Sequence, residues 1–152
     1  MKIYLGADHA GFELKEKIKK FLTAKEFEVE DMGPYKYNSK DDYPDYAIKV
    51  CEKILRDRKG MKGILFCGSG HGMCIAANKF PSIRATICWS IESVKYAKTH
   101  TNVNVLCIPA RLINLRKTKK IVLEWLELPF RHEKRHIRRI NKIKKIEKKY
   151  IR

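Results

Sequence analysis

The run at residues 63–79 joins a cysteine to three closely spaced glycines, a pattern that favours anion binding beside a nucleophile. An apolar segment ends at Cys67, and Gly68, Gly70 and Gly72 follow at every second position. Glycine permits positive φ and lets a ligand approach the main chain closely. Successive N–H groups can then face one anion, and their positive potential favours a thiolate. The run therefore predicts a site for negative charge, with Cys67 as a base or nucleophile.

Each polar residue of this run also has a structural interpretation. Free cysteine is among the most buried residue types, so Cys67 could simply end a core strand. Ser69 could be a turn residue, or its hydroxyl could bond a substrate oxygen, and His71 could contact a ligand or lie unused in an exposed loop. Because glycines follow Cys67 so closely, a catalytic role for this residue is as well supported as a structural role in the core.

Other candidate residues are spread along the chain. Asp8 precedes a helical pattern and is either a helix cap or a site residue, with His9 beside it. His100 ends an amphipathic segment. Arginine binds phosphate oxygens in pairs, which makes three arginines candidates for a phosphate, although each could equally be surface charge: Arg111, Arg135 and Arg139.

The elements that must position these residues follow an alternating strand–helix pattern. Short apolar runs alternate with longer amphipathic ones, which is typical of βαβ units on a parallel sheet. We predict strands at 3–5, 27–31, 63–66, 83–89 and 103–108, and helices at 12–24, 46–58, 73–79, 93–99 and 117–126. The predicted fold is an α/β three-layer sandwich, a Rossmann-like five-stranded parallel sheet with helices on both faces and a C-terminal helical tail. Ligands of such sheets bind at the carboxyl ends of the strands, where residues 6–9, 67–72, 89–90 and 109–111 should converge.

Length and composition limit which classes of protein this chain can belong to. A chain of 152 residues is expected to form one domain over 1–152, and no apolar stretch is long enough to span a membrane. Five cysteines without CxxC spacing disfavour a disulfide framework or a zinc site. We therefore expect a cytoplasmic protein that holds no metal.

The positive charge is concentrated at the C-terminus. The formal net charge is +17, and residues 111–152 carry 16 basic against 4 acidic side chains. No nucleic-acid-binding motif accompanies this charge, so nucleic acid is not the favoured partner. Isoleucines at 137, 140, 143 and 146 place an apolar stripe on a helix, and we expect the basic tail at 131–152 to pack on a partner subunit.

Taken together, these segments resemble the ribose-5-phosphate isomerase B family of sugar-phosphate isomerases. The resemblance extends to about residue 140. It rests on the segments at 6–12, 42–47, 63–79, 83–85, 100–106 and 110–111, with Arg135, His136 and Arg139. It implies aldose–ketose isomerisation of a sugar phosphate through a cis-enediolate, without a cofactor. It also implies a homodimer or tetramer with the active site at the subunit interface.

The resemblance also implies roles for individual residues. Cys67 would be the base that moves a proton between C2 and C1, Ser69 would help to relay protons between the oxygens, and His100 would open the sugar ring with Asp8 nearby. The backbone of the loop from Gly68 through Gly70 to Gly72 would hold the enediolate. The sugar or its phosphate would contact these side chains: His9, His71, Thr101, Arg111, Arg135 and Arg139.

Several positions depart from the family pattern. Thr101 stands where asparagine is usual, Pro109 where glycine is usual, and Cys74 where serine is usual. Two alternatives to ribose 5-phosphate isomerisation also stay open, since isomerisation needs only C1 and C2 of the sugar and the basic tail could bind anions. The first is an isomerase of allose or galactose 6-phosphate, and the second is a non-catalytic protein that binds phosphate or nucleic acid.

Overall fold

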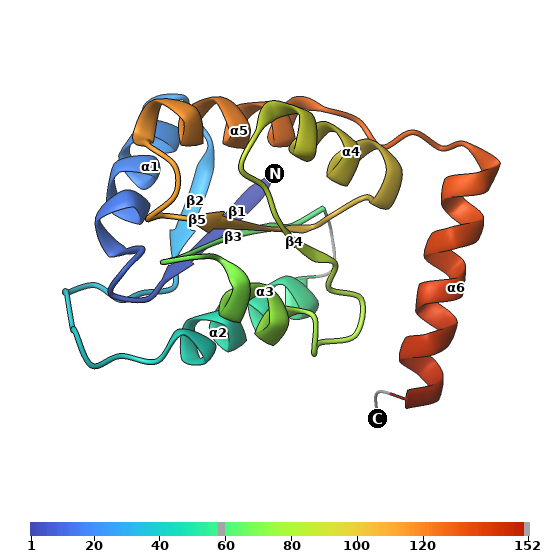
Figure 1. The fold of residues 1–152 in the computed structure, drawn as a ribbon, viewed down its shortest axis with the longest axis horizontal. Coiled ribbons are helices and arrows are strands. Elements are labelled where there is room, and N and C mark those ends of the chain that lie inside the picture. The colour runs from blue at the N-terminus through green and yellow to red at the C-terminus, as the bar shows by residue number, and fades with distance from the viewer. Residues whose placement is uncertain (58–59, 151–152) are drawn as a thin grey trace.

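Five short strands form a parallel sheet in the computed structural model, which describes residues 1–57 and 60–150 (Figure 1). The strands are β1 (Lys2–Ala7), β2 (Glu28–Asp31), β3 (Lys62–Cys67), β4 (Ala85–Ile87) and β5 (Val105–Pro109). Their order in the sheet is β2-β1-β3-β5-β4, and every neighbouring pair is parallel. The predicted five-stranded parallel sheet is confirmed.

Five helices cover the two faces of the sheet. The helices α1 (Phe12–Ala24), α4 (Ile91–Thr101) and α5 (Leu115–Glu127) cover one face, and α2 (Tyr43–Asp57) and α3 (His71–Ala77) cover the other (Figure 1). Side chains alternate between faces along a strand. Ile64 and Phe66 accordingly pack under α1 and α5, whereas Leu65 packs against α2. The strands are buried on both sides, which explains why they are short apolar runs.

A few predicted boundaries are corrected by the structure. The strand predicted at 83–89 is only Ala85–Ile87, because the N–H of Arg84 bonds the side chain of Asn104 instead of a neighbouring strand. The helix predicted from residue 46 begins at Tyr43, and its predicted last residue, 58, lies outside the described residues. The helix predicted at 73–79 begins earlier, at His71.

The basic tail forms α6 (Lys134–Tyr150), which stands apart from the sandwich (Figure 1). Only His136 and Ile140 of this helix are buried. Ile137, Ile143 and Ile146 are 39%, 42% and 57% exposed, so most of the predicted apolar stripe has no cover within the described chain. The last two residues of the predicted tail, 151 and 152, lie outside the described residues.

Two edges of the sheet matter for function. We call the edge where β1, β3, β4 and β5 end the carboxyl edge, and the edge where they begin the amino edge. Figure 1 shows α6 beside the amino edge. No helix in the described part of the chain is long and apolar enough to cross a bilayer.

Candidate active site

Cys67 is the last residue of β3 and lies at the carboxyl edge, as predicted. It is 4% exposed, and its Sγ accepts a hydrogen bond from the N–H of Gly70 at 3.1 Å. Gly70 has a φ of +82°, a conformation that side chains rarely adopt. This glycine therefore turns the chain sharply from the strand into α3 and aims a main-chain donor at the sulfur.

The environment of Cys67 differs from the sequence-based expectation in one respect. Burial raises the pKa of this thiol, and the nearby charge of Asp8 raises it further. Backbone N–H groups of Met73, Gly70 and Ser69 act in the opposite direction but do not outweigh burial. Within one chain the thiol is therefore held protonated more strongly than an ordinary cysteine, whereas a lowered pKa was expected.

The glycine loop is covered by two side chains from other elements. A Cβ at Gly68 would lie 3.3 Å from Nη1 of Arg111, and the backbone N–H of Arg111 donates to the carbonyl of Gly68 at 3.0 Å. A Cβ at Gly72 would overlap the ring of Tyr43 at the start of α2. Glycine at both positions lets a guanidinium and a phenol ring lie directly on the main chain beside Cys67.

Asp8 and His9 follow β1 at the same edge. Gly11 allows α1 to begin directly against β3, since a Cβ there would overlap the backbone of Phe66. The Asp8 carboxylate is 6% exposed and accepts the N–H of Gly11 at 3.0 Å, and burial raises its pKa. Asp8 thus holds the turn before α1 and lies close enough to Cys67 for its charge to act on the thiol.

His9 is fixed by a carboxylate that the sequence analysis did not single out. Oδ1 of Asp41 contacts Nδ1 of His9 at 2.8 Å and accepts the backbone N–H of His9 at 2.9 Å. The Asp41 side chain is 4% exposed, and among the described residues its Oδ2 has no hydrogen-bond partner. This contact spans 32 positions and leaves Nε2 as the ring nitrogen available to a ligand.

Ser69 in the glycine loop and His71 at the start of α3 are both exposed. The Ser69 hydroxyl lies 3.5 Å from the N–H of His71, at the limit of a hydrogen bond. Both side chains are therefore accessible at the carboxyl edge. The structure thus gathers the following predicted residues there: Asp8, His9, Cys67, Gly68, Ser69, Gly70, His71, Gly72 and Arg111.

The remaining predicted residues lie at the amino edge. His100 is the next-to-last residue of α4, two residues before the connection that leads into β5, and its ring stacks on that of His136 at 4.4 Å between centroids. The expectation that Asp8 lies near His100 is therefore not met within one chain, because Asp8 follows the carboxyl end of β1 whereas His100 precedes the amino end of β5.

Thr101, Arg135 and Arg139 share this second location. The Thr101 hydroxyl donates to the carbonyl of Ala97 at 2.6 Å, and Nε of Arg135 pairs with Glu133 at 2.8 Å. Arg139 is exposed on α6. The candidate site is thus divided into a thiol half at the carboxyl edge and a histidine–arginine half at the amino edge.

Two functional candidates, Asp41 and Tyr43, were missed as individual residues. Both belong to the loop and helix start around the segment 42–47, which carried the family resemblance without a role for each side chain. The only signal was that segment, since neither residue falls on a periodic pattern. Among the described residues no group of three His, Cys, Asp or Glu side chains could hold a metal ion.

Comparison with known proteins identifies the class of this chain. The family model described as Ribose/Galactose Isomerase matches residues 3–143, and the chain belongs to this family and is an isomerase. A protein of Mycoplasma genitalium named probable ribose-5-phosphate isomerase B is 40% identical over 146 residues, which cover 96% of this chain and 95% of that protein.

Solved structures agree with this assignment. A ribose 5-phosphate isomerase from Thermotoga maritima has a TM-score of 0.90 and 46% identity, covering 95% of this chain and 97% of that one. Ribose-5-phosphate isomerase B of Mycoplasma genitalium, solved with bound ribulose-5-phosphate, has a TM-score of 0.92 and 39% identity. The match covers 97% of this chain and 96% of that one. The recognised family and the Rossmann-like fold are both confirmed.

Proposed function

We propose that this protein interconverts ribose 5-phosphate and ribulose 5-phosphate through a cis-enediolate, with Cys67 as the base. The observation that carries the proposal is the buried thiol at a glycine loop under Arg111, in a chain similar to an enzyme solved with ribulose-5-phosphate. Isomerisation of a sugar phosphate requires a base that moves a proton between two carbons and a cation that binds the phosphate.

The proposed chemistry balances within the sugar. The thiolate of Cys67 removes the proton from C2 of the aldose, and the electron pair moves through C1 to O1. The proton returns to C1, while Ser69 relays the hydroxyl proton from O2 to O1. Because C1 is reduced as C2 is oxidised, no external oxidant or reductant is needed. The N–H of Gly70, which faces Sγ, favours the thiolate.

The second half of the site is proposed to come from another copy of the chain. His100, Arg135 and Arg139 lie at the amino edge, so they cannot join Cys67 in the same molecule without refolding. The exposed isoleucines of α6 offer an apolar face for a second copy. In such a homodimer, His100 opens the sugar ring and the two arginines of α6 bind the phosphate, which orients C1 and C2.

The choice of substrate is tested by parallel assays on three sugar phosphates. Purified protein is supplied with ribose 5-phosphate, allose 6-phosphate or galactose 6-phosphate in the presence of a chelator, and ketose phosphate is measured. We expect the highest kcat/KM on ribose 5-phosphate. Preference for a six-carbon sugar would overturn the substrate, and absence of turnover on all three would favour a phosphate-binding protein.

The base is tested with a matched pair of cysteine variants. Cys67→Ala should lower kcat at least about 100-fold, because it removes the group that moves the proton. Cys74→Ser is the control, since Cys74 is a half-buried thiol on α3 that stands where the family usually has serine. Survival of Cys67→Ala activity within about tenfold of the parent would exclude this residue as the base.

A further inference from the structure

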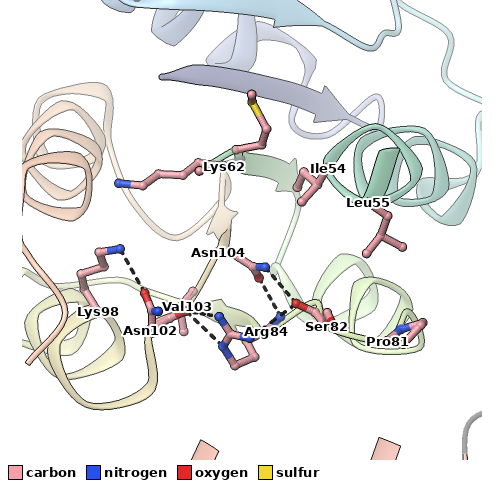
Figure 2. Close-up of a pocket in the computed structure, with 12 residues that line it drawn as sticks. Ile54, Leu55, Lys62, Pro81, Ser82, Arg84, Lys98, Asn102, Val103 and Asn104 are labelled. Atoms are coloured by element: carbon pink, nitrogen blue, oxygen red, sulfur yellow. Dashed lines mark hydrogen bonds between the residues drawn. The ribbon is translucent and has the colours of Figure 1, made fainter. Parts of the chain in front are cut away.

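A second concentration of positive charge lines a pocket of about 700 Å³ at the amino edge (Figure 2). The pocket lies between the end of α2, the start of β3, the residues before β4 and the end of α4. Three cations contribute to its wall: Lys62, Arg84 and Lys98. None of them belongs to either half of the candidate active site.

Arg84 is already used by the protein. Its guanidinium donates to the carbonyls of Thr101 and Asn102 at 2.8 to 3.1 Å, and these carbonyls end α4. The carboxylate of Glu147 on α6 accepts the N–H of Ser82 at 3.1 Å. Burial lowers the pKa of Arg84, and the charge of Glu147 opposes this shift without outweighing it. Arg84 therefore offsets the negative end of a helix and a nearby acid.

The two lysines have no comparable compensation. Nζ of Lys62 donates to the carbonyl of Leu126 at 3.2 Å, and Nζ of Lys98 lies 3.4 Å from Oδ1 of Asn102. In the described part of the chain both ammonium groups thus bond neutral oxygens rather than carboxylates. Each ammonium has three donors, so most of their hydrogen-bonding capacity is left for another group.

Burial makes this arrangement costly. Lys98 is 8% exposed, and Lys62 lies over the ring of Trp125 at 5.1 Å. Burial and the charge of Lys98 lower the pKa of Lys62 to about 8, and burial and the charge of Arg84 lower the pKa of Lys98. Figure 2 shows the two ammonium groups on the same side of the pocket. Repelling cations in a half-buried pocket are stabilised by a bound anion.

We propose that this pocket binds a small phosphorylated molecule, with a phosphate or diphosphate group between Lys62 and Lys98. The opposite wall carries Ile54 and Leu55, which suit the less polar body of such a molecule. The volume exceeds what an inorganic ion needs and lies within the range of ordinary small-molecule sites. This site is distinct from the thiol half of the active site and does not depend on the proposed isomerase substrate.

The pocket also has a direct structural connection to His100. Arg84 and Lys98 line the pocket and contact the carbonyls or side chain of residues 101–102, which directly follow His100. A ligand that draws Lys98 toward its phosphate would change how the end of α4 is held. Occupancy of the pocket is thus expected to alter kcat more than KM for the sugar.

The test is a calorimetric titration of the full chain with ADP and, separately, with inorganic pyrophosphate. We expect Lys62→Gln to weaken binding of ADP about tenfold, since it removes a charge-assisted contact. The matched control is Lys95→Gln, because Lys95 also lies on α4 but pairs with Glu124 outside the pocket. The control should bind like the parent, and Lys62→Gln should keep its isomerase activity without ADP.

The outcomes separate this site from the substrate site. Pyrophosphate that binds the parent and the control but not Lys62→Gln also supports the pocket and assigns the recognition to the diphosphate itself. Equal binding of ADP by all three proteins, or no binding by the parent, would overturn the proposal. If Lys62→Gln fails to fold, the same titrations are made with Lys98→Gln, whose ammonium group lies on the same side of the pocket. Loss of isomerase activity in the parent would refute the proposed function without affecting this titration.

Discussion

At the scale of single residues, the contact between His9 and Asp41 determines which nitrogen of the imidazole can meet a substrate. Since Nδ1 faces Asp41 at 2.8 Å, the ring presents Nε2 outward. We expect Asp41→Ala to lower kcat/KM about 10- to 100-fold, because His9 would lose its orientation. Asp42→Ala is the control, as Asp42 is an exposed neighbour in the same loop. Steady-state kinetics that leave both variants like the parent would contradict this positioning role.

A second residue-scale prediction concerns the charge of Asp8 and the titration of Cys67. The carboxylate of Asp8 raises the pKa of the thiol, so removing its charge must lower that pKa. Asp8→Asn keeps an oxygen for the N–H of Gly11. We therefore expect alkylation of Cys67 by iodoacetamide to begin at lower pH in Asp8→Asn than in the parent. The same alkylation profile in both proteins would show that Asp8 does not act on the thiol.

The same residues show what sequence could and could not reveal. Asp8, Cys67 and Arg111 could be grouped in advance, because parallel strands bring their carboxyl ends to one edge. The contacts of Asp41 with His9 and of Tyr43 with Gly72 could not, since they depend on how an irregular loop folds back. The raised pKa of Cys67 was also missed, because burial is a property of packing rather than of a motif.

At the scale of elements, α6 contacts the rest of the chain through the buried side chains of His136 and Ile140 and through the hydrogen bond of Glu147 with Ser82, and His136 is the titratable group among the buried two. His136 is 2% exposed, stacks on His100, and has two ring nitrogens without hydrogen-bond partners among the described residues. Burial lowers its pKa from the ordinary 6.5, and the charges of His100, Arg135 and Arg139 act in the same direction, whereas Glu133 opposes them. The folded helix therefore favours the neutral ring.

This environment predicts that α6 loosens in mild acid. A histidine with a lowered folded pKa binds fewer protons when folded, so its contribution to stability is complete above pH 6.5 and decreases as the pH falls below that value. We expect faster amide hydrogen exchange in α6 at pH 5.5 than at pH 7.5, after correction for intrinsic rates. His136→Phe keeps a stacking ring but cannot titrate, so it should remove this dependence. Uniform protection of α6 in the parent at both pH values would refute the prediction.

The ends of helices and strands were predicted correctly where the hydrophobic pattern itself ended. They were predicted wrongly where a tertiary contact ended the element. The amphipathic helix at 12–24 was predicted at its observed bounds, because its apolar face is unbroken. The fourth strand was predicted too long, since apolar residues continue on both sides of Ala85–Ile87 while the side chain of Asn104 ends the pairing. The tail was correctly predicted as a helix, but the apolar stripe of isoleucines does not reveal which surface packs against it.

At the scale of the whole molecule, the two halves of the candidate site are separated by the length of the strands, because one lies at the carboxyl edge and the other at the amino edge. Cys67 ends β3, while His100 is the next-to-last residue of α4, which runs back from the carboxyl to the amino edge. In the proposed mechanism the thiol half transfers the proton and the histidine–arginine half opens the ring, so both halves are needed in one site. If two chains exchange these halves symmetrically, each dimer has two sites, and each site takes Cys67 from one copy and His100 from the other.

A mixing experiment tests this exchange directly. Cys67→Ala and His100→Gln should each be almost inactive alone. When the two variants are unfolded together and refolded, each mixed dimer has one site with both substitutions and one site with neither. Since random pairing makes half of the dimers mixed, we expect activity to return to about a quarter of the parent value. Mixing Cys67→Ala with Cys67→Ala,His100→Gln is the control, because no intact site can form. Activity that does not return in the first mixture, although mixed dimers are present by mass spectrometry, would place both residues in one chain's site or exclude one of them from catalysis.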